Sequence, residues 1–231
     1  MKTQAIEVTN LAKSFELSKG KTVQILNGLS LSANYGEFIS ILGVSGSGKS
    51  TLLKCMSGLL QPSQGKVEIQ GLDPYQTSPN KLAKLRRESL AFIFQSYNLV
   101  PALPIIENIA LPLRLSGKKV NNQEILELLE KLQFKADSKA FPSTLSGGEQ
   151  QKIAIARAIL ADSQIIFADE PTGALDSTSR QIVFDILRTL ANQGKCILMV
   201  THDIELASKT DRALILKDCL LYTSPSPRDM R

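Results

Sequence analysis

A glycine-rich stretch, "GVSGSGKS", occupies residues 43–50 and fits the pattern GxxxxGK[ST]. Glycines at these positions let the backbone turn its N–H groups inward around a phosphate. Lys49 can add a positive charge to the terminal phosphates, and the Ser50 hydroxyl can ligate Mg²⁺. We expect this loop to bind the phosphates of a nucleotide through Gly43, Ser45, Gly46, Gly48, Lys49, Ser50 and Thr51.

An acidic pair, Asp169 and Glu170, ends the apolar run "IIFADE". Ligands of α/β sheets bind beyond the carboxyl ends of the strands. There Asp169 can hold a Mg²⁺ shell, and Glu170 can orient and deprotonate a water. Adjacent strand residues point to opposite faces, so the pair serves one site only if the following "PTG" breaks the alternation. The alternative is two acids that only solubilise a strand end.

Three single residues extend the same pattern. His202 follows the apolar run "CILMV" and can contact a terminal phosphate, although a lone histidine is more often structural. Gln95 follows "AFIF", where its amide can reach Mg²⁺ or water. Phe15 can stack on an adenine ring, with packing in the core as the alternative.

A second loop shaped for an anion lies in "LSGGEQQKIAIARA", residues 145–158. Ser146, Gly147 and Gly148 precede a helical pattern, and a helix N-terminus favours negative charge. The chain thus carries two candidate phosphate loops about a hundred residues apart.

The surrounding elements read as an α/β core with a helical insert. Alternating apolar residues predict strands within the first forty residues, and "FISIL" predicts a buried strand feeding the glycine-rich loop. Helices are predicted for "KSTLLKCMSGLL", with leucines 52, 53, 59 and 60 on one face, and for "NNQEILELLEKLQF", with a stripe of Ile125, Leu126, Leu129 and Leu132. The insert spans about 96–161, after which strands and helices alternate again.

Composition excludes several classes. The chain of 231 residues has 43% hydrophobic and 21% charged residues, which is typical of a globular domain. No run approaches the ~20 apolar residues of a membrane-spanning helix, and we read no signal peptide at the N-terminus. Three scattered cysteines fit neither a disulfide framework nor a metal site. The net charge of +5 is dispersed, so we predict no nucleic-acid partner.

In this order, the five motifs resemble those of ATP-binding cassette (ABC) ATPases: "GVSGSGKST", Gln95, "LSGGEQQ", "IIFADEPTGALD" and His202. The resemblance covers nearly all of residues 1–218. It implies a P-loop NTPase core with an N-terminal antiparallel β subdomain and an inserted α-helical subdomain. It also implies ATP and Mg²⁺ as cofactors.

The resemblance assigns roles residue by residue. It implies that Phe15 stacks on adenine, that Lys49 and Gln95 act at the catalytic centre with Glu170 as the base, and that His202 is the switch. It implies Ser50, Gln95 and Asp169 as the metal shell. Ser146, Gly147, Gly148 and Asp176 would complete an ATP site of a second subunit, in a head-to-tail homodimer with two ATPs at the interface.

Within the family, "FIFQSYNLVPALPIIENIALPL" with "ADEPTGALD" is similar to the branch of macrolide and antimicrobial-peptide exporters, lipoprotein release and the cell-division complex. This implies a subunit that powers a separate membrane permease from the cytoplasmic face of the plasma membrane. Export of antimicrobial peptides or macrolides is the first reading, and a lipoprotein-release or cell-division role that drives a mechanical signal is the alternative. A nucleic-acid ABC ATPase and a non-hydrolysing binding module are the less favoured alternatives.

The last thirteen residues, "CLLYTSPSPRDMR" (219–231), depart from the family pattern. A turn residue such as glycine is expected after Asp218, and the string resembles a translated sequencing-library adapter. We therefore expect the natural sequence to leave this frame at Asp218, and the alternative is a natural disordered tail.

Overall fold

The computed structural model describes residues 3–16 and 20–223 of the chain. Within them, the larger sheet has the strand order β5-β6-β7-β3-β8-β9. Strands β5, β6, β7, β3 and β8 run parallel to one another, whereas β9 is antiparallel to β8. The strands are β3 (Phe38–Leu42), β5 (Leu90–Ile93), β6 (Ile165–Asp169), β7 (Cys196–Val200), β8 (Arg212–Lys217) and β9 (Leu220–Thr223).

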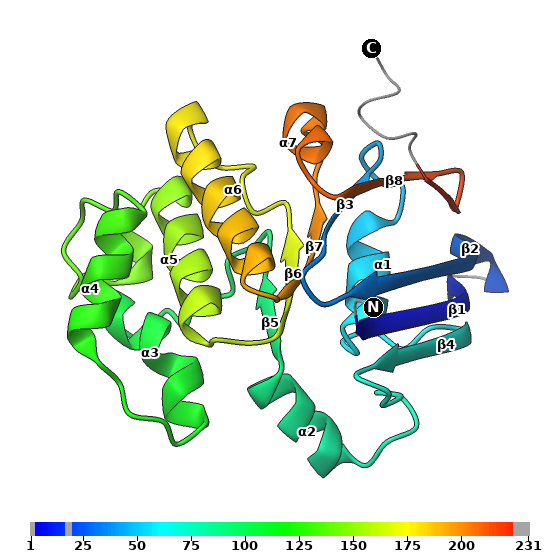
Figure 1. Cartoon of the computed structure of the whole chain (residues 1–231), viewed down its shortest axis with the longest axis horizontal. Helices are drawn as coiled ribbons and strands as arrows, with labels where there is room; N and C mark the ends of the chain where they lie inside the picture. The colour runs from blue at the N-terminus through cyan, green and yellow to red at the C-terminus, as the bar shows by residue number, and fades with distance from the viewer. Residues whose placement is uncertain (1–2, 17–19, 224–231) are drawn as a thin grey trace.

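A smaller antiparallel sheet lies at one end of the molecule, at the right of Figure 1. Its order is β2-β1-β4. The strands are β1 (Gln4–Glu16), β2 (Thr22–Asn34) and β4 (Gln64–Ile69).

The opposite end is helical, and the larger sheet lies between the two ends (Figure 1). This end contains α3 (Ile105–Leu115), α4 (Asn122–Lys131), a short 3₁₀ turn (Pro142–Thr144) and α5 (Gly147–Leu160). The other helices are α1 (Lys49–Met56), α2 (Pro79–Glu88), α6 (Ser177–Asn192) and α7 (Ile204–Ser208). The predicted α/β core with an antiparallel β part and a helical part is confirmed.

Both faces of the parallel sheet are buried, each in its own apolar core. In β6, Ile166 and Ala168 pack with the helical side, whereas Ile165 and Phe167 pack with α1 and the small sheet. Strand β7 alternates in the same way, so every residue of β6 and β7 is buried. Parallel sheets covered on both faces have such continuous apolar strands.

Two details of the predicted helices are wrong. Helix α1 ends at Met56, so Leu59 and Leu60 lie beyond it and Leu59 is exposed. Gly58 has a φ of +75°, a left-handed conformation that stops a helix at low cost. On α4, Leu126 is exposed although its stripe neighbours Ile125 and Leu129 are buried. Within the described residues, no helix has the length and apolarity needed to cross a membrane.

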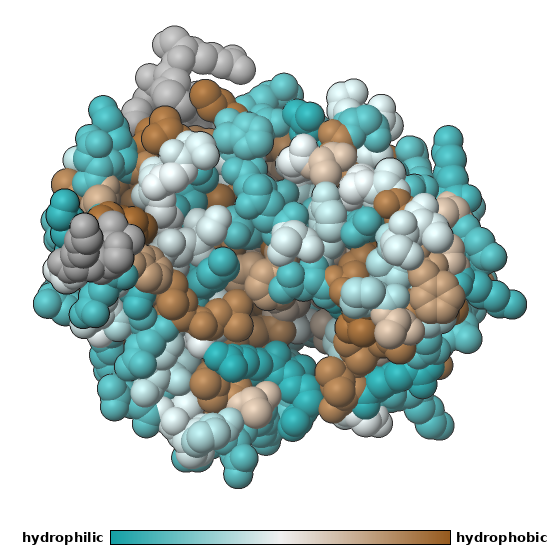
Figure 2. Space-filling view, turned by 180° about the vertical axis from the view of Figure 1, so that it is seen from behind, coloured by the Kyte–Doolittle hydropathy of each residue, from teal (hydrophilic) through white to brown (hydrophobic). Residues whose placement is uncertain are grey.

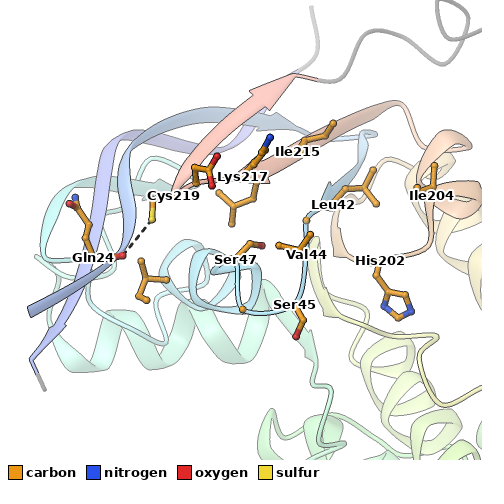
Figure 3. Close-up of a pocket in the computed structure, with 15 residues that line it drawn as sticks. Gln24, Leu42, Val44, Ser45, Ser47, His202, Ile204, Ile215, Lys217 and Cys219 are labelled. Atoms are coloured by element: carbon orange, nitrogen blue, oxygen red, sulfur yellow. Dashed lines mark hydrogen bonds between the residues drawn. The ribbon is translucent and has the colours of Figure 1, made fainter.

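The hairpin between β8 and β9 turns through Asp218 and Cys219. Lys217 pairs with Leu220, so the loop has two residues, and both have positive φ, 50° and 63°. Such turns favour glycine at the second position. The Cys219 thiol donates to the carbonyl oxygen of Gln24 on β2, 3.4 Å away (Figure 3). The adapter origin of residues 219–231 stays a prediction, and its part from 224 to 231 lies outside the described residues.

This turn yields a test of the strain at Cys219. A left-handed conformation costs an L-residue about 1–2 kcal/mol, while the extra freedom of glycine in the unfolded chain costs about 0.5–1 kcal/mol. We expect Cys219→Gly to raise the free energy of unfolding by about 0.5–1 kcal/mol, measured by urea denaturation. Cys219→Ala removes the same thiol but keeps Cβ. A glycine variant no more stable than the alanine variant would contradict the strain.

Candidate functional site

The glycine-rich loop, the acidic pair, Gln95 and His202 gather at the carboxyl edge of the parallel sheet. Strand β3 leads into the glycine-rich loop and α1, and β6 ends at Asp169. Strands β5 and β7 are followed by Gln95 and His202. Since parallel strands end at the same edge, four separate segments of the chain meet there.

The loop from Gly43 to Gly48 is shaped by its glycines. Gly46 and Gly48 have φ values of +78° and +97°. A Cβ atom on Gly43 would lie 2.6 Å from the Leu216 carbonyl oxygen, so a side chain there would collide with β8. The loop therefore requires glycine for both its conformation and its packing.

Lys49 lies inside this loop and is only 8% exposed. Its Nζ atom donates to the carbonyl oxygens of Gly43 and Val44, each 2.9 Å away. These contacts place a desolvated ammonium at the centre of the loop, where an anion would find a strong partner.

Ser50 and Asp169 are brought together from α1 and β6. The serine hydroxyl donates to Asp169 Oδ1 at 2.8 Å. Burial raises the pKa of the Asp169 carboxyl above its usual value, and the hydrogen bond from Ser50 and the charges of Lys54 and Lys49 oppose this rise. A hydroxyl beside a carboxylate is the all-oxygen donor set that suits Mg²⁺.

Glu170, the first residue after β6, does not continue the extended strand conformation. Its φ of +50° is left-handed, so the chain turns directly after Asp169. Its carboxylate Oε2 lies 2.9 Å from His202 Nδ1, which follows β7. The two adjacent acids can thus face one region although neighbours on a strand point apart.

A cavity of about 550 Å³ lies beside these groups, and Asp169 borders it only through its partner Ser50. Seven predicted residues line it, together with four that the sequence did not single out, Tyr97, Gln151, Gly173 and Ala174. The predicted ones are Ser45, Gly46, Lys49, Ser50, Gln95, Glu170 and His202.

The second predicted loop lies elsewhere. Ser146 caps α5: its hydroxyl accepts from the Glu149 N–H, and its own N–H donates to the Glu149 carboxylate. Asp176 caps α6 through Ser179, and these hydrogen bonds lower the pKa of the Asp176 carboxyl. A separate cavity of about 520 Å³ is lined by Ser146, Gly148, Asp176 and neighbouring residues. Gly147 is beside Tyr97, whose hydroxyl would be 2.9 Å from an added Cβ.

Phe15 is not brought to either cavity. It lies on β1, is 39% exposed, and its ring is 4.9 Å from Lys13 Nζ. A further cavity of about 730 Å³ lies on the outer side of the glycine-rich loop (Figure 3). Apolar side chains such as Val44 and Ile204 line it, and neither acid of the pair does.

The loop after Gln95 is held by residues that the sequence did not reveal. Tyr97 and Asn98 are both left-handed, with φ of 63° and 48°. Arg157 of α5 donates to both of their carbonyl oxygens, at 2.7 and 2.6 Å. The fully buried Asn108 of α3 bonds to the Val100 N–H and to the carbonyl oxygens of residues 100, 103 and 104.

Known proteins share the sequence pattern and the fold of this chain. A family model described as "ABC transporter" matches residues 26–173. The "Macrolide export ATP-binding/permease protein MacB" of Chlorobaculum tepidum is 37% identical over 98% of this chain. The "Lipoprotein-releasing system ATP-binding protein LolD" of Shewanella oneidensis is 39% identical over 98% of this chain and 99% of its own.

A solved structure shares the whole fold. It is titled "Dimeric structure of a post-hydrolysis state of the ATP-binding cassette MJ0796 bound to ADP and Pi". The TM-score is 0.90 at 34% identity, over 96% of this chain and 99% of the other. The chain spans only 35% of the length of the MacB relative.

Mutation tests the two hydrogen bonds that Arg157 donates to the loop after Gln95. Arg157→Met keeps the aliphatic stem but loses both charged hydrogen bonds, so we expect unfolding to become easier by about 2 kcal/mol, measured by urea denaturation. Hydrogen exchange should also quicken in residues 95–104. Arg114→Met removes an exposed arginine that pairs with Glu107 and should cost less than about 0.5 kcal/mol. Equal losses for the two variants would contradict the special role of Arg157.

Proposed function

The chain belongs to the ABC transporter family and has the fold of its ATPase cassettes, and on that premise we propose that it hydrolyses ATP to power a membrane permease. The observation that carries this proposal is the cavity of about 550 Å³. It gathers the buried Lys49, the Ser50 hydroxyl and the carboxylate–histidine pair at one edge of the sheet.

Each of these side chains has a role in the proposed reaction. Lys49 binds the terminal phosphates and exchanges its carbonyl partners for phosphate oxygens. Ser50 and Asp169, with Gln95, would hold Mg²⁺, which neutralises phosphate charge when bound. Glu170 accepts a proton from the attacking water, and His202 orients that carboxylate and contacts the terminal phosphate.

ATP is proposed to lie between two copies of the chain. Ser146, Gly148 and Asp176 line a cavity apart from the Lys49 site, as expected for residues that act on the partner's nucleotide. Gly147 lies between Ser146 and Gly148 at the start of α5 and would act with them. The capping box at Ser146 fixes the N-terminus of α5, whose orphan N–H groups favour an anion. Head-to-tail pairing would place the Ser146 loop of each copy at the Lys49 site of the other copy. Phe15, exposed near the C-terminal end of β1, would stack on adenine.

The membrane partner is proposed to dock beside the Gln95 loop, on the helical subdomain of residues 96–161 and the adjoining core. A groove of about 610 Å³ lies between α2, β5, α3 and α5, and its lining includes Phe92, Phe94 and Leu111. Leu115 on its rim is 68% exposed. Figure 2 shows apolar surface around a notch at the lower edge of the molecule, the edge at which α2 lies in Figure 1. An exposed apolar patch of this kind suits a protein partner at the cytoplasmic face of the plasma membrane.

Export of macrolides or antimicrobial peptides is the first proposal for the complex. The similarity to an exporter cassette over 98% of this chain supports it. Lipoprotein release is the second proposal, and it is favoured by the LolD relative, because this chain covers 99% of that relative's length. Residues 1–218 would form the whole cassette. Sequencing the adjacent open reading frame, which would encode the permease, would distinguish the two.

The role of Glu170 predicts a trapped dimer. Glu170→Gln keeps the size of the side chain and one acceptor oxygen but cannot accept the proton, so we expect turnover to fall by about 10²–10⁴-fold. With ATP and Mg²⁺ the variant should elute as a dimer in size-exclusion chromatography, and as a monomer with ADP. A variant that stays monomeric at saturating ATP would count against this mechanism.

The loop at Ser146 predicts a defect that acts only in the dimer. Gly148→Asp places a carboxylate where the partner's phosphate would lie, so hydrolysis should be lost while ATP affinity of the monomer changes less than about twofold. ATPase assays and equilibrium binding at low protein concentration measure the two effects. Gly148→Ala controls for crowding, since an added Cβ would lie 3.0 Å from the Ala174 oxygen. Loss of ATP binding by the monomer would show that the loop acts on its own chain's site.

A further inference from the structure

Gln151 has a buried amide whose nitrogen is unpaired in the described part of the chain. It lies on α5 and is 1% exposed. Among the described residues, its Nε2 atom has no hydrogen-bond partner. A buried donor left unpaired is costly, so natural proteins rarely keep one without a reason.

The same side chain lines the cavity that holds the Lys49 site. Gln151 is the member of that lining that comes from α5, and it shares the cavity with Gln95, Glu170 and Lys49. Two charged groups of the lining already have partners within the chain: Glu170 contacts His202, and Lys49 donates to loop carbonyls. The Gln151 side chain therefore borders a space whose proposed occupant is the phosphate end of ATP, and its buried Nε2 atom would donate there once the side chain turns into the cavity.

We infer that Gln151 is a positioning residue of the hydrolytic site, whose amide donates a hydrogen bond to an oxygen in this cavity. The inference rests on the proposed ATPase function. The oxygen belongs either to the terminal phosphate or to the attacking water. In both cases the bond sets the position of α5 relative to the nucleotide bound by the same chain.

The place of Gln151 along α5 gives this bond a wider effect. The helix begins after Ser146, one turn before Gln151, with the capped loop that we assign to the partner's site. Arg157, roughly 9 Å further along the axis, holds the carbonyls of Tyr97 and Asn98. A nucleotide contact at Gln151 thus fixes the one helix that links the two phosphate loops and the Gln95 loop.

The test uses Gln151→Met in the full chain. Methionine has a similar length and no polar donor, so the variant relieves the unpaired amide. We expect the melting temperature without nucleotide to rise by about 2–4 °C. At the same time kcat should fall about tenfold, the effect of losing one hydrogen bond in the transition state. A residue with a merely structural role would lower stability and leave kcat unchanged.

A second variant and nucleotide binding identify the oxygen. Gln151→Glu keeps the shape but offers an acceptor to an anion, so it should impair kcat more than methionine does. If the bond goes to the terminal phosphate, both variants lose affinity for ATP and keep affinity for ADP. If it goes to the water, affinity for both nucleotides is unchanged while kcat falls. Either pattern supports the inference.

A matched control distinguishes a failure of the Gln151 inference from a failure of the proposed ATPase function. Gln181→Met changes an exposed glutamine on α6 that bonds to Asp185, and it should leave kcat and KM unchanged. If the wild-type chain hydrolyses ATP and Gln151→Met has the same kcat and KM, the inference about Gln151 is overturned alone. If the wild type neither binds nor hydrolyses ATP, the proposed function fails as well.

Discussion

The burial of both faces of the parallel sheet is the constraint on which the rest of the molecule depends. Strands β6 and β7 send alternate apolar side chains into two separate cores, so neither strand can carry a charge along its length. Polar chemistry is left to the strand ends. Asp169 is the one charged residue within these two strands, and it is the last residue of β6.

That edge is made usable by local departures from regular structure. The glycine-rich loop needs two left-handed glycines, and Glu170 adopts a left-handed conformation without being glycine. Such strain of about 1–2 kcal/mol persists only where the surrounding packing fixes it. Here the Glu170 N–H bonds to the Val200 carbonyl, and its carboxylate meets His202. Stability supplied by the two cores thus holds the acids in positions that a regular strand would not give.

Much of the fold was predictable because its signals are local. Apolar strands, the phosphate pattern and the ends of β6 and β7 follow from short stretches of sequence. The sequence could not settle whether Asp169 and Glu170 share a region, because that depends on one φ value. The apolar periodicity also predicted too long a helix α1, because the periodicity continues past Gly58, where the helix has already ended. The surface position of Phe15 likewise depends on strands that are distant in sequence.

Arg157 and Gln151 were missed for a different reason. Gln151 lies at the spacing of the buried residues Ile155 and Ala158 on α5, so a polar residue in an apolar stripe was the available signal. It was hidden within a motif already explained by its glycines. Arg157 acts on backbone carbonyls of a loop almost sixty residues away, and a contact to backbone leaves no mark on the sequence of its partner.

The pinned loop after Gln95 has a mechanical consequence. Asn108 and Arg157 together occupy the backbone carbonyls of residues 97, 98, 100, 103 and 104. A slack loop would absorb a push from the apolar groove as bending. The held loop instead moves together with α3 and α5, and the segment from Phe94 to Ser96, which includes Gln95, joins it to β5. A displacement at the groove would therefore reach the Gln95 amide.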